Sequence, residues 1–251
     1  MTAPALATRG LCKTFGGIAA TQDVTLSLAR GARQALIGPN GAGKTTLVNL
    51  LTGVLAPSAG AIELDGVDVT TMPTHRRARL GLMRTFQINQ LFTRFTPLET
   101  LALVCAQRSG AGGHMVRALG RHLTAVDEAA ALLVQFHLSG DMHRMVRELP
   151  YGKRRLLEIA VAVAGRPRVL LLDEPLAGVP AGESGEILDT LAALPPDVCV
   201  LLIEHDMDLV FRFASRISVM VNGALLVEGS ADAIARDPQV RAVYLGGADR
   251  G

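Results

Sequence analysis

The stretch "GPNGAGKTT", residues 38 to 46, decides which fold to expect from this chain. It follows the short apolar run "RQALI" (33–37) and leads into the helical pattern "KTTLVNLLTG" (44–53), so the context is strand, loop and helix. Glycines let backbone N–H groups turn inward around an anion, and a helix N-terminus adds positive partial charge. The stretch fits G-x-x-x-x-G-K-[ST], in which Lys44 reaches the phosphates of a nucleotide and Thr45 offers its hydroxyl to Mg²⁺. We expect a phosphate cradle made of Gly38, Pro39, Asn40, Gly41, Ala42, Gly43, Lys44, Thr45 and Thr46.

The apolar run "RVLLLDEP" (168–175) supplies a second part of the same chemistry. It reads as a buried strand that ends in Asp173, where a carboxylate can hold the shell of a Mg²⁺ ion. Glu174 comes next and could polarise an attacking water. The alternative is that both acids only cap the following helix. The cradle upstream favours the catalytic interpretation.

A histidine, His205 in "LLIEHDMDLV" (201–210), directly follows a third apolar run. Ligands of doubly wound sheets collect at the carboxyl ends of strands, so His205 could contact a terminal phosphate and orient Glu174. A lone histidine is more often structural, and position alone leaves both interpretations open.

Predicted strands and helices alternate both before residue 88 and after residue 165, which indicates an α/β core. Hairpins are expected over 61–69 and 216–229, turning at Asp65-Gly66 and Asn222-Gly223. The segment from about 88 to 165 changes character, with helical patterns at 97–107, 124–136 and 152–164. The sequence therefore predicts an α/β core with a helical insertion.

Composition narrows the class of protein. Apolar residues make up 49% and aromatic residues only 4% of the chain, which suits a parallel sheet covered by helices. A net charge of +2 gives no reason to expect a nucleic-acid partner. Three scattered cysteines fit a reducing compartment. With neither a secretory signal nor an apolar run of roughly 18 residues in view, we expect a soluble protein that can dock onto a membrane protein.

Together these motifs resemble the ATP-binding subunit of ABC transporters over nearly the whole chain. Within that family, "FGGIAA" (15–20), "RTFQ" (84–87), "EHDM" (204–207) and "AVYLGG" (242–247) look most like the ATPases of branched-chain amino-acid importers and their hydrophobic-amino-acid or amide relatives. The resemblance implies a P-loop NTPase with a RecA-like α/β core, an antiparallel β subdomain and an inserted helical subdomain at about 88–165. All three would belong to a single ATP-binding domain, residues 1–251.

The same resemblance implies ATP and Mg²⁺ as cofactors and adds two site residues. Phe15 would stack on adenine, the alternative being an ordinary apolar surface residue. Gln87 would join Thr45 and Asp173 around Mg²⁺ and the attacking water, the alternative being a polar loop residue. Residues 88–100 would then face the membrane subunit.

The family works as a dimer in which each ATP lies between one cradle and the partner's signature helix. Here the signature position reads "LPYGK", Leu149, Pro150, Tyr151, Gly152 and Lys153, where the family has Leu-Ser-Gly-Gly-Gln. Proline has neither the hydroxyl nor the N–H that serine offers to a phosphate. Pro180 also stands where the family expects Asp or Asn. These departures favour an asymmetric heterodimer, with a homodimer as the alternative.

The expected function is ATP hydrolysis that powers import of branched-chain or related hydrophobic amino acids or amides. Transmembrane permease subunits and, indirectly, an external solute-binding protein would be the partners, and the chain would lie on the cytoplasmic face of the membrane. Two alternatives remain open at this point. One is a regulatory nucleotide-binding partner with low activity, and the other is a soluble ABC ATPase for DNA repair or translation.

Overall fold

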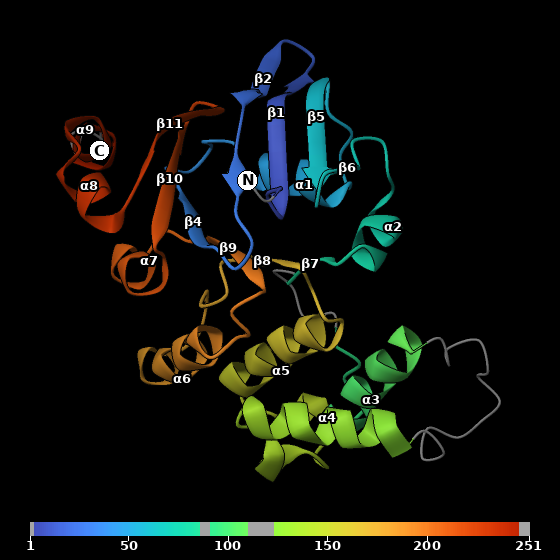
Figure 1. Cartoon of the computed structure of the whole chain (residues 1–251). Helices are drawn as coiled ribbons and strands as arrows, with labels where there is room; N and C mark the ends of the chain where they lie inside the picture. Colours follow the sequence, from blue (N-terminus) through green and yellow to red (C-terminus); the bar gives the residue numbers. More distant parts are fainter. Residues whose placement is uncertain (1–2, 86–90, 110–122, 246–251) are drawn as a thin grey trace. The chain divides into compact units, whose positions relative to one another are not determined.

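The computed structural model describes residues 3–85, 91–109 and 123–245 (Figure 1). The chain divides into two compact units. The first contains residues 1–84, 168–174 and 195–251, and the second contains 85–167 and 175–194. The second unit thus extends beyond the helical segment expected at about 88–165, because it also takes in 175–194. Each unit is described by itself.

An antiparallel sheet opens the first unit. It contains β1 (Leu6–Phe15), β2 (Ile18–Val24), β3 (Ser27–Leu28), β5 (Ala59–Leu64) and β6 (Val67–Asp68), in the order β2-β1-β5-β6 with β3 also paired to β1 (Figure 1). The predicted hairpin between β5 and β6 is confirmed. Its turn has positive φ at both Asp65 (50°) and Gly66 (80°), as a tight two-residue turn between twisted strands requires.

A second sheet carries the parallel strands of the first unit. Its order is β11-β10-β4-β9-β8-β7, and every neighbouring pair is parallel except β10 and β11. The predicted turn at Asn222-Gly223 joins that antiparallel pair. The strands are β4 (Arg33–Ile37), β7 (Leu82–Arg84), β8 (Val169–Asp173), β9 (Cys199–Ile203), β10 (Arg216–Val221) and β11 (Ala224–Gly229).

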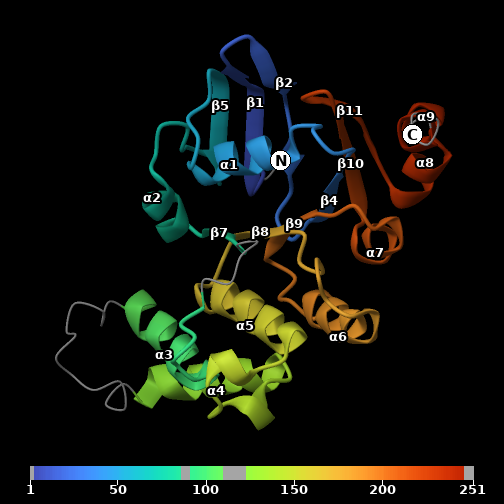
Figure 2. The ribbon, with the colours of Figure 1, turned by 180° about the vertical axis from the view of Figure 1, so that it is seen from behind.

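Helices cover both faces of β4. Leu36 joins a core that combines α1 (Lys44–Thr52) with residues of both sheets, while Ala35 and Ile37 point to a core shared with α7 (Met207–Phe213) and α8 (Ala231–Arg236). Adjacent residues of a strand face opposite sides, so the three consecutive residues Ala35, Leu36 and Ile37 must all be apolar. Figure 2 shows α7 and α8 on the β10 side of this unit. The remaining helices of the unit are α2 (Thr74–Arg79) and α9 (Pro238–Leu245).

The second unit is helical over its described residues. Its first helix is fixed by a capping box, in which the Thr96 side chain accepts from the Glu99 N–H and the Glu99 carboxylate accepts from the Thr96 N–H. That helix packs on the next two long helices. The elements are α3 (Pro97–Arg108), α4 (Leu123–Gln135), the 3₁₀ turns η3 (Ser139–Asp141) and η4 (Val146–Glu148), α5 (Tyr151–Ala164) and α6 (Ala181–Ala192).

The predicted fold class is confirmed, including the helices expected at 97–107, 124–136 and 152–164. Strands β1 and β2 were expected only through the family resemblance, and β7, only three residues long, was not expected at all. None of the helices in the described ranges is long and apolar enough to cross a bilayer.

Candidate functional site

Three of the predicted site segments follow neighbouring strands of the parallel sheet. The cradle follows β4, Asp173 ends β8, and His205 lies two residues after β9. Strand β9 pairs with β4 on one side and with β8 on the other, all parallel. The carboxyl ends of parallel strands meet at one edge, so the sheet order itself brings these segments together.

The cradle requires glycine at both glycine positions of the G-x-x-x-x-G-K-[ST] motif, because the backbone there passes close to neighbouring carbonyl oxygens. Gly38 has φ 154° and a Cβ there would collide with the Met220 carbonyl oxygen. Gly43 has φ 98° and a Cβ there would collide with the Ala20 carbonyl oxygen on β2. Both conformations are ones that residues with a side chain rarely adopt. Of the other cradle residues, Asn40, Gly41 and Thr45 are exposed, Pro39 and Thr46 are partly buried, and Ala42 is buried.

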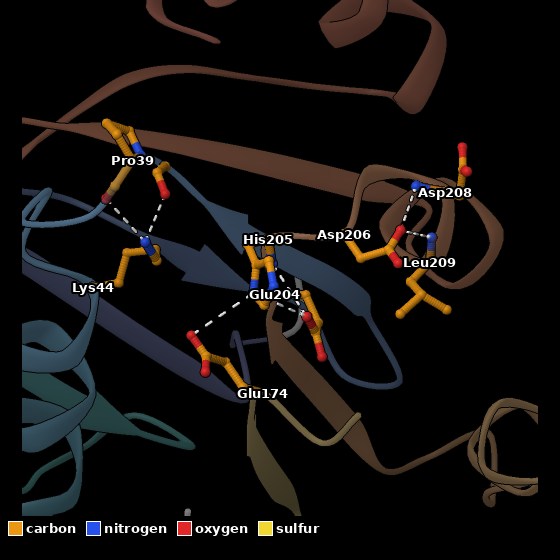
Figure 3. A network of polar contacts seen from close by, with 9 residues as sticks. Pro39, Lys44, Glu174, Glu204, His205, Asp206, Asp208 and Leu209 are labelled. Carbon is orange, nitrogen blue, oxygen red and sulfur yellow. Dashed lines mark hydrogen bonds and ion pairs between the residues drawn. The ribbon is translucent and has the colours of Figure 1, made fainter. Parts of the chain in front are cut away.

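Lys44 is the first residue of α1, and its ammonium group turns back onto the loop. Nζ donates to the carbonyl oxygens of Gly38 at 2.6 Å and Pro39 at 3.1 Å (Figure 3). Partial burial lowers the pKa of Lys44, and the carboxylates of Glu174 and Asp173 act in the opposite direction. The Lys44 ammonium group therefore interacts electrostatically with both predicted acids.

Asp173 is buried and paired with an arginine that the sequence analysis did not single out. Arg84 Nη2 lies 2.7 Å from Asp173 Oδ2, and Arg84 Nη1 donates to Asn49 Oδ1 on α1 at 2.7 Å. The sequence feature that could have indicated Arg84 is its position: a charged residue that ends the mainly apolar run "LGLMR" (80–84), directly before the "TFQ" of the family motif. Its partners are 89 and 35 residues away in sequence.

Glu174 has a backbone conformation that is unusual for its residue type. Its φ is 45°, in the left-handed region, and its N–H donates to the Ile203 carbonyl oxygen at 2.9 Å. Such a conformation costs about 1–3 kcal/mol and persists where the surroundings fix it, typically at functional sites. Here the bond to the end of β9 holds the backbone, so the side chain leaves the sheet in a defined direction.

His205 lies beside Glu174, as expected from its position after β9. Its Nδ1 is 3.9 Å from Glu174 Oε1 and 3.7 Å from Glu204 Oε2 (Figure 3). The imidazole is 68% exposed while the Glu204 side chain is buried. Both distances start from the same ring nitrogen and exceed a hydrogen bond, so they place the imidazole within ion-pair range of both carboxylates. Glu204 is a second acid that the sequence analysis missed, because it reads as the last residue of an apolar run.

The structure describes only one of the two site residues taken from the family resemblance. Phe15 ends β1 with 47% of its surface exposed, and Lys13 Nζ lies 5.2 Å from the ring centroid. An exposed ring leaves a face for stacking, as adenine binding would need. Gln87 lies outside the described residues.

The signature segment lies in the second unit, at the start of α5. Leu149 is buried, and Pro150 is the N-cap residue, with φ −55° and no side-chain hydrogen bond. Lys153 Nζ contacts the Glu186 carboxylate and the His137 carbonyl oxygen, each at 2.9 Å. The charge of Lys153 is thus paired inside this unit, which limits what it can offer to a phosphate on another chain.

The other two signature residues contact the segment before α6 and the first turn of α6. Tyr151 donates its hydroxyl hydrogen to the Ala177 carbonyl oxygen at 2.9 Å. Gly152 packs so closely on the Glu183 carboxylate that a Cβ at this position would collide with it. The first turn of α5 is therefore held against residues 177–186 of the same unit.

Comparisons with known proteins decide the family. The sequence pattern of the ABC transporter family matches residues 21–177, more than half of the chain. The chain belongs to the ABC transporter family. A second pattern, described as branched-chain amino acid ATP-binding cassette transporter, matches residues 224–250.

Relatives of this ABC protein are similar over their full length. The chain is 39% identical to the high-affinity branched-chain amino acid transport ATP-binding protein BraF of Pseudomonas aeruginosa, over 98% of this chain and 99% of that protein. It is 38% identical to the high-affinity branched-chain amino acid transport ATP-binding protein LivG of Escherichia coli, again over 98% of this chain and 99% of that protein. A solved ATP-binding cassette of an ABC transporter in its ADP conformation has a TM-score of 0.83 and 29% identity, covering 98% of this chain and 100% of that one.

Family membership establishes the basic activity. The chain is an ABC-type ATPase that binds ATP and hydrolyses it. The Asp173 carboxylate and the Thr45 hydroxyl are hard oxygen donors, the type of ligand that Mg²⁺ selects, so the residues present fit that ion.

Proposed function

We propose that this chain powers import of branched-chain or related hydrophobic amino acids, or of amides, through separate membrane subunits. The observation that carries the proposal is identity of 38–39% over 98% of the chain with branched-chain amino acid transport ATP-binding proteins. The match of residues 224–250 to the branched-chain pattern supports the same solute class. The two units would act as one ATP-binding domain, residues 1–251.

The cradle residues 38–46 would bind the phosphates of ATP through inward-facing N–H groups. Lys44 would exchange the carbonyl oxygens of Gly38 and Pro39 for phosphate oxygens, which its flexible stem permits. Phe15 would stack on the adenine ring, and its exposed face supports this role.

The metal site would consist of Thr45, Asp173 and Gln87. A bound Mg²⁺ supplies charge neutralisation for the phosphates. Asp173 presents its carboxylate from the rigid end of β8, and Thr45 presents its hydroxyl from the first turn of α1.

Glu174 would accept a proton from the attacking water, with His205 orienting it and contacting the terminal phosphate. The strained backbone at Glu174 supports this assignment, because it fixes where the carboxylate starts. Gln87 would help to hold the same water. The substitution Glu174→Gln keeps the shape of the side chain but removes the carboxylate oxygen that would accept the proton.

The signature segment, Leu149 to Lys153, would act on the ATP of a second subunit. Because Pro150 lacks a donor and Lys153 is paired within its own unit, its contribution would be weaker than that of a Ser-containing signature. A heterodimer with a second ATP-binding subunit accounts best for this asymmetry, and a homodimer is the alternative.

The surface after residue 90 would dock on a transmembrane permease. Phe92 and Phe95 are exposed and their rings stack with centroids 5.1 Å apart, and Met145 is exposed nearby in the fold of the same unit. The Val146 N–H donates to the Phe95 carbonyl oxygen, which places Met145 next to this pair. Exposed apolar clusters mark interaction sites. The chain would thus be peripheral on the cytoplasmic face of the membrane, with an external solute-binding protein as an indirect partner and no nucleic acid.

The test measures ATP hydrolysis by the chain alone against protein concentration, and then with the membrane subunits and a second ATPase subunit. Glu174→Gln is expected to lower turnover by at least about 100-fold, as removal of a general base does, and to leave ATP binding intact. Turnover that rises faster than linearly with concentration indicates self-pairing, and turnover that needs the second subunit indicates a heterodimer. Preserved turnover in Glu174→Gln would contradict the role of Glu174. Failure of radiolabelled leucine, valine or amides to enter vesicles of the full complex would contradict the solute class.

A further inference from the structure

Arg84 ends β7 in the first unit and is a largely buried cation of the site. Its guanidinium side chain is 11% exposed and that of Asp173 is 4% exposed, so their ion pair is shielded from water. One Nη atom contacts Asp173 Oδ2 and the other donates to Asn49 Oδ1, both at 2.7 Å. Two short bonds from one planar group fix both partners at once.

The two partners belong to the two elements that present the proposed metal ligands. Asn49 lies four residues after Thr45 on α1, about one turn further along the same side of the helix. Asp173 is the last residue of β8. The guanidinium therefore links the helix that carries the Thr45 hydroxyl to the strand that carries the Asp173 carboxylate.

We infer that Arg84 is a positioning residue of the metal site, which holds the Asp173 carboxylate in place and fixes its separation from the Thr45 helix. The inference rests on the proposed Mg²⁺–nucleotide site and names a further residue for it. Loss of Arg84 would remove this ion pair from a buried carboxylate, which favours rotation of the Asp173 side chain toward water. Lysine would keep the charge but would not reproduce the fixed two-pronged geometry.

The experiment measures ADP binding to the purified chain, which needs no hydrolysis and no partner. The readout is the Mg²⁺ concentration that gives half of the ADP-dependent rise in Tm, together with the ADP Kd in EDTA. Arg84→Met is expected to raise the half-saturating Mg²⁺ concentration by about tenfold or more, as loss of a group that orients a metal ligand does. The ADP Kd in EDTA is expected to stay within about twofold, because the cradle itself is untouched.

Three further variants separate positioning from general loss of stability. Arg84→Lys should give an intermediate shift. Asn49→Ala keeps the pair with Asp173 and removes only the link to α1, so it should shift the Mg²⁺ requirement less but in the same direction. Arg77→Lys is the matched control, because Arg77 is also buried and donates to carbonyl oxygens of α1, at Leu50 and Leu51. It should lower Tm and leave the Mg²⁺ requirement unchanged.

A folded Arg84→Met variant with an unchanged or lowered Mg²⁺ requirement would overturn the inference; a lowered one would mean that Arg84 competes with the metal. If Arg84→Met does not fold, Asn49→Ala decides by the same readout. If ADP stabilises the unaltered chain equally with and without Mg²⁺, the proposed metal site itself fails. That result differs from failure of Arg84 alone, in which the unaltered chain keeps its metal dependence.

Discussion

Two prolines, Pro150 and Pro180, occupy the N-cap positions of α5 and α6 in the second unit. Their φ values are −55° and −57°, and neither helix has a side-chain cap. In each case proline stands where the family pattern has a residue able to cap the helix with its side chain, Ser at the first and Asp or Asn at the second. Proline fits the backbone geometry of a helix start but leaves the first N–H groups without that partner.

We predict that Pro150→Ser strengthens ATP-dependent pairing and barely changes stability. A serine cap contributes about 0.5–2 kcal/mol, but losing the proline releases about 0.4–1 kcal/mol of unfolded-state entropy, so the two largely cancel. The new hydroxyl and N–H can donate to a phosphate, and such a bond to a charged group is worth about 1.5–3 kcal/mol. Sedimentation of the Glu174→Gln chain with ATP should then show association tightened at least about tenfold, since each 1.4 kcal/mol is a factor of ten.

The matched control for this prediction is Pro73→Ser. Pro73 is the N-cap residue of α2 in the first unit, with φ −69° and no side-chain cap hydrogen bond. The same chemical change at that helix should leave pairing as it was. Equal pairing of Pro150→Ser and the unaltered chain, both alone and with the second ATP-binding subunit, would remove the signature segment from the dimer contact.

At the scale of elements, the first turn of α5 is bound to α6 and to the segment that leads into it. Tyr151 bonds to the Ala177 carbonyl oxygen, Gly152 packs on Glu183, and the next residue pairs with Glu186. Consecutive residues of one helical turn thus contact one short stretch of chain. These contacts join residues 177–186 to the signature segment within the second unit.

A double-mutant cycle tests the tightest of these contacts. In an ordinary helix Gly→Ala stabilises by about 0.5–1 kcal/mol. At Gly152 the new methyl group meets the Glu183 carboxylate, which must swing aside, so we expect that movement to offset the gain in the otherwise unaltered chain. In a Glu183→Ala background the gain should return, giving a coupling of about 1 kcal/mol in the free energy of unfolding. Urea denaturation measures it, and additive effects would mean that Glu183 moves aside freely.

At the scale of the whole molecule, each unit contains one buried cysteine whose exposure reports the unfolding of that unit. Cys12 in the first unit is partly buried, while Cys199 in the first unit and Cys105 in the second are buried. Burial raises the pKa of the Cys199 thiol to about 12 and also raises the pKa of Cys105. A protonated thiol without solvent access does not react with alkylating reagents.

We therefore predict one fast thiol in the native chain at pH 8. Mass spectrometry after brief alkylation should find the label on Cys12, with Cys105 and Cys199 labelled only as denaturant opens their units. The two midpoints then report the unfolding of each unit separately, and Cys12→Ser provides the control for the fast phase. Labelling of Cys199 as fast as Cys12 without denaturant would contradict the buried position of β9.

The sequence by itself determined the cradle, the two hairpin turns and the order of strand ends that carry Asp173, Glu174 and His205. These features depend on local chemistry: glycines with positive φ, a Lys-Thr pair at a helix start, and apolar runs that end in polar residues. The family resemblance added the antiparallel sheet, Phe15 and Gln87, which periodicity alone did not reveal.

Only the tertiary structure decided what these residues meet. The pairing of Arg84 with Asp173 and Asn49 joins positions 89 and 35 residues apart, and the pairing of Lys153 with Glu186 joins positions 33 apart. No local pattern encodes such partners, because they depend on strand order and helix packing. The backbone of Glu174 is left-handed for the same reason: its N–H is bound to the end of β9, a strand that begins 25 residues later in the chain.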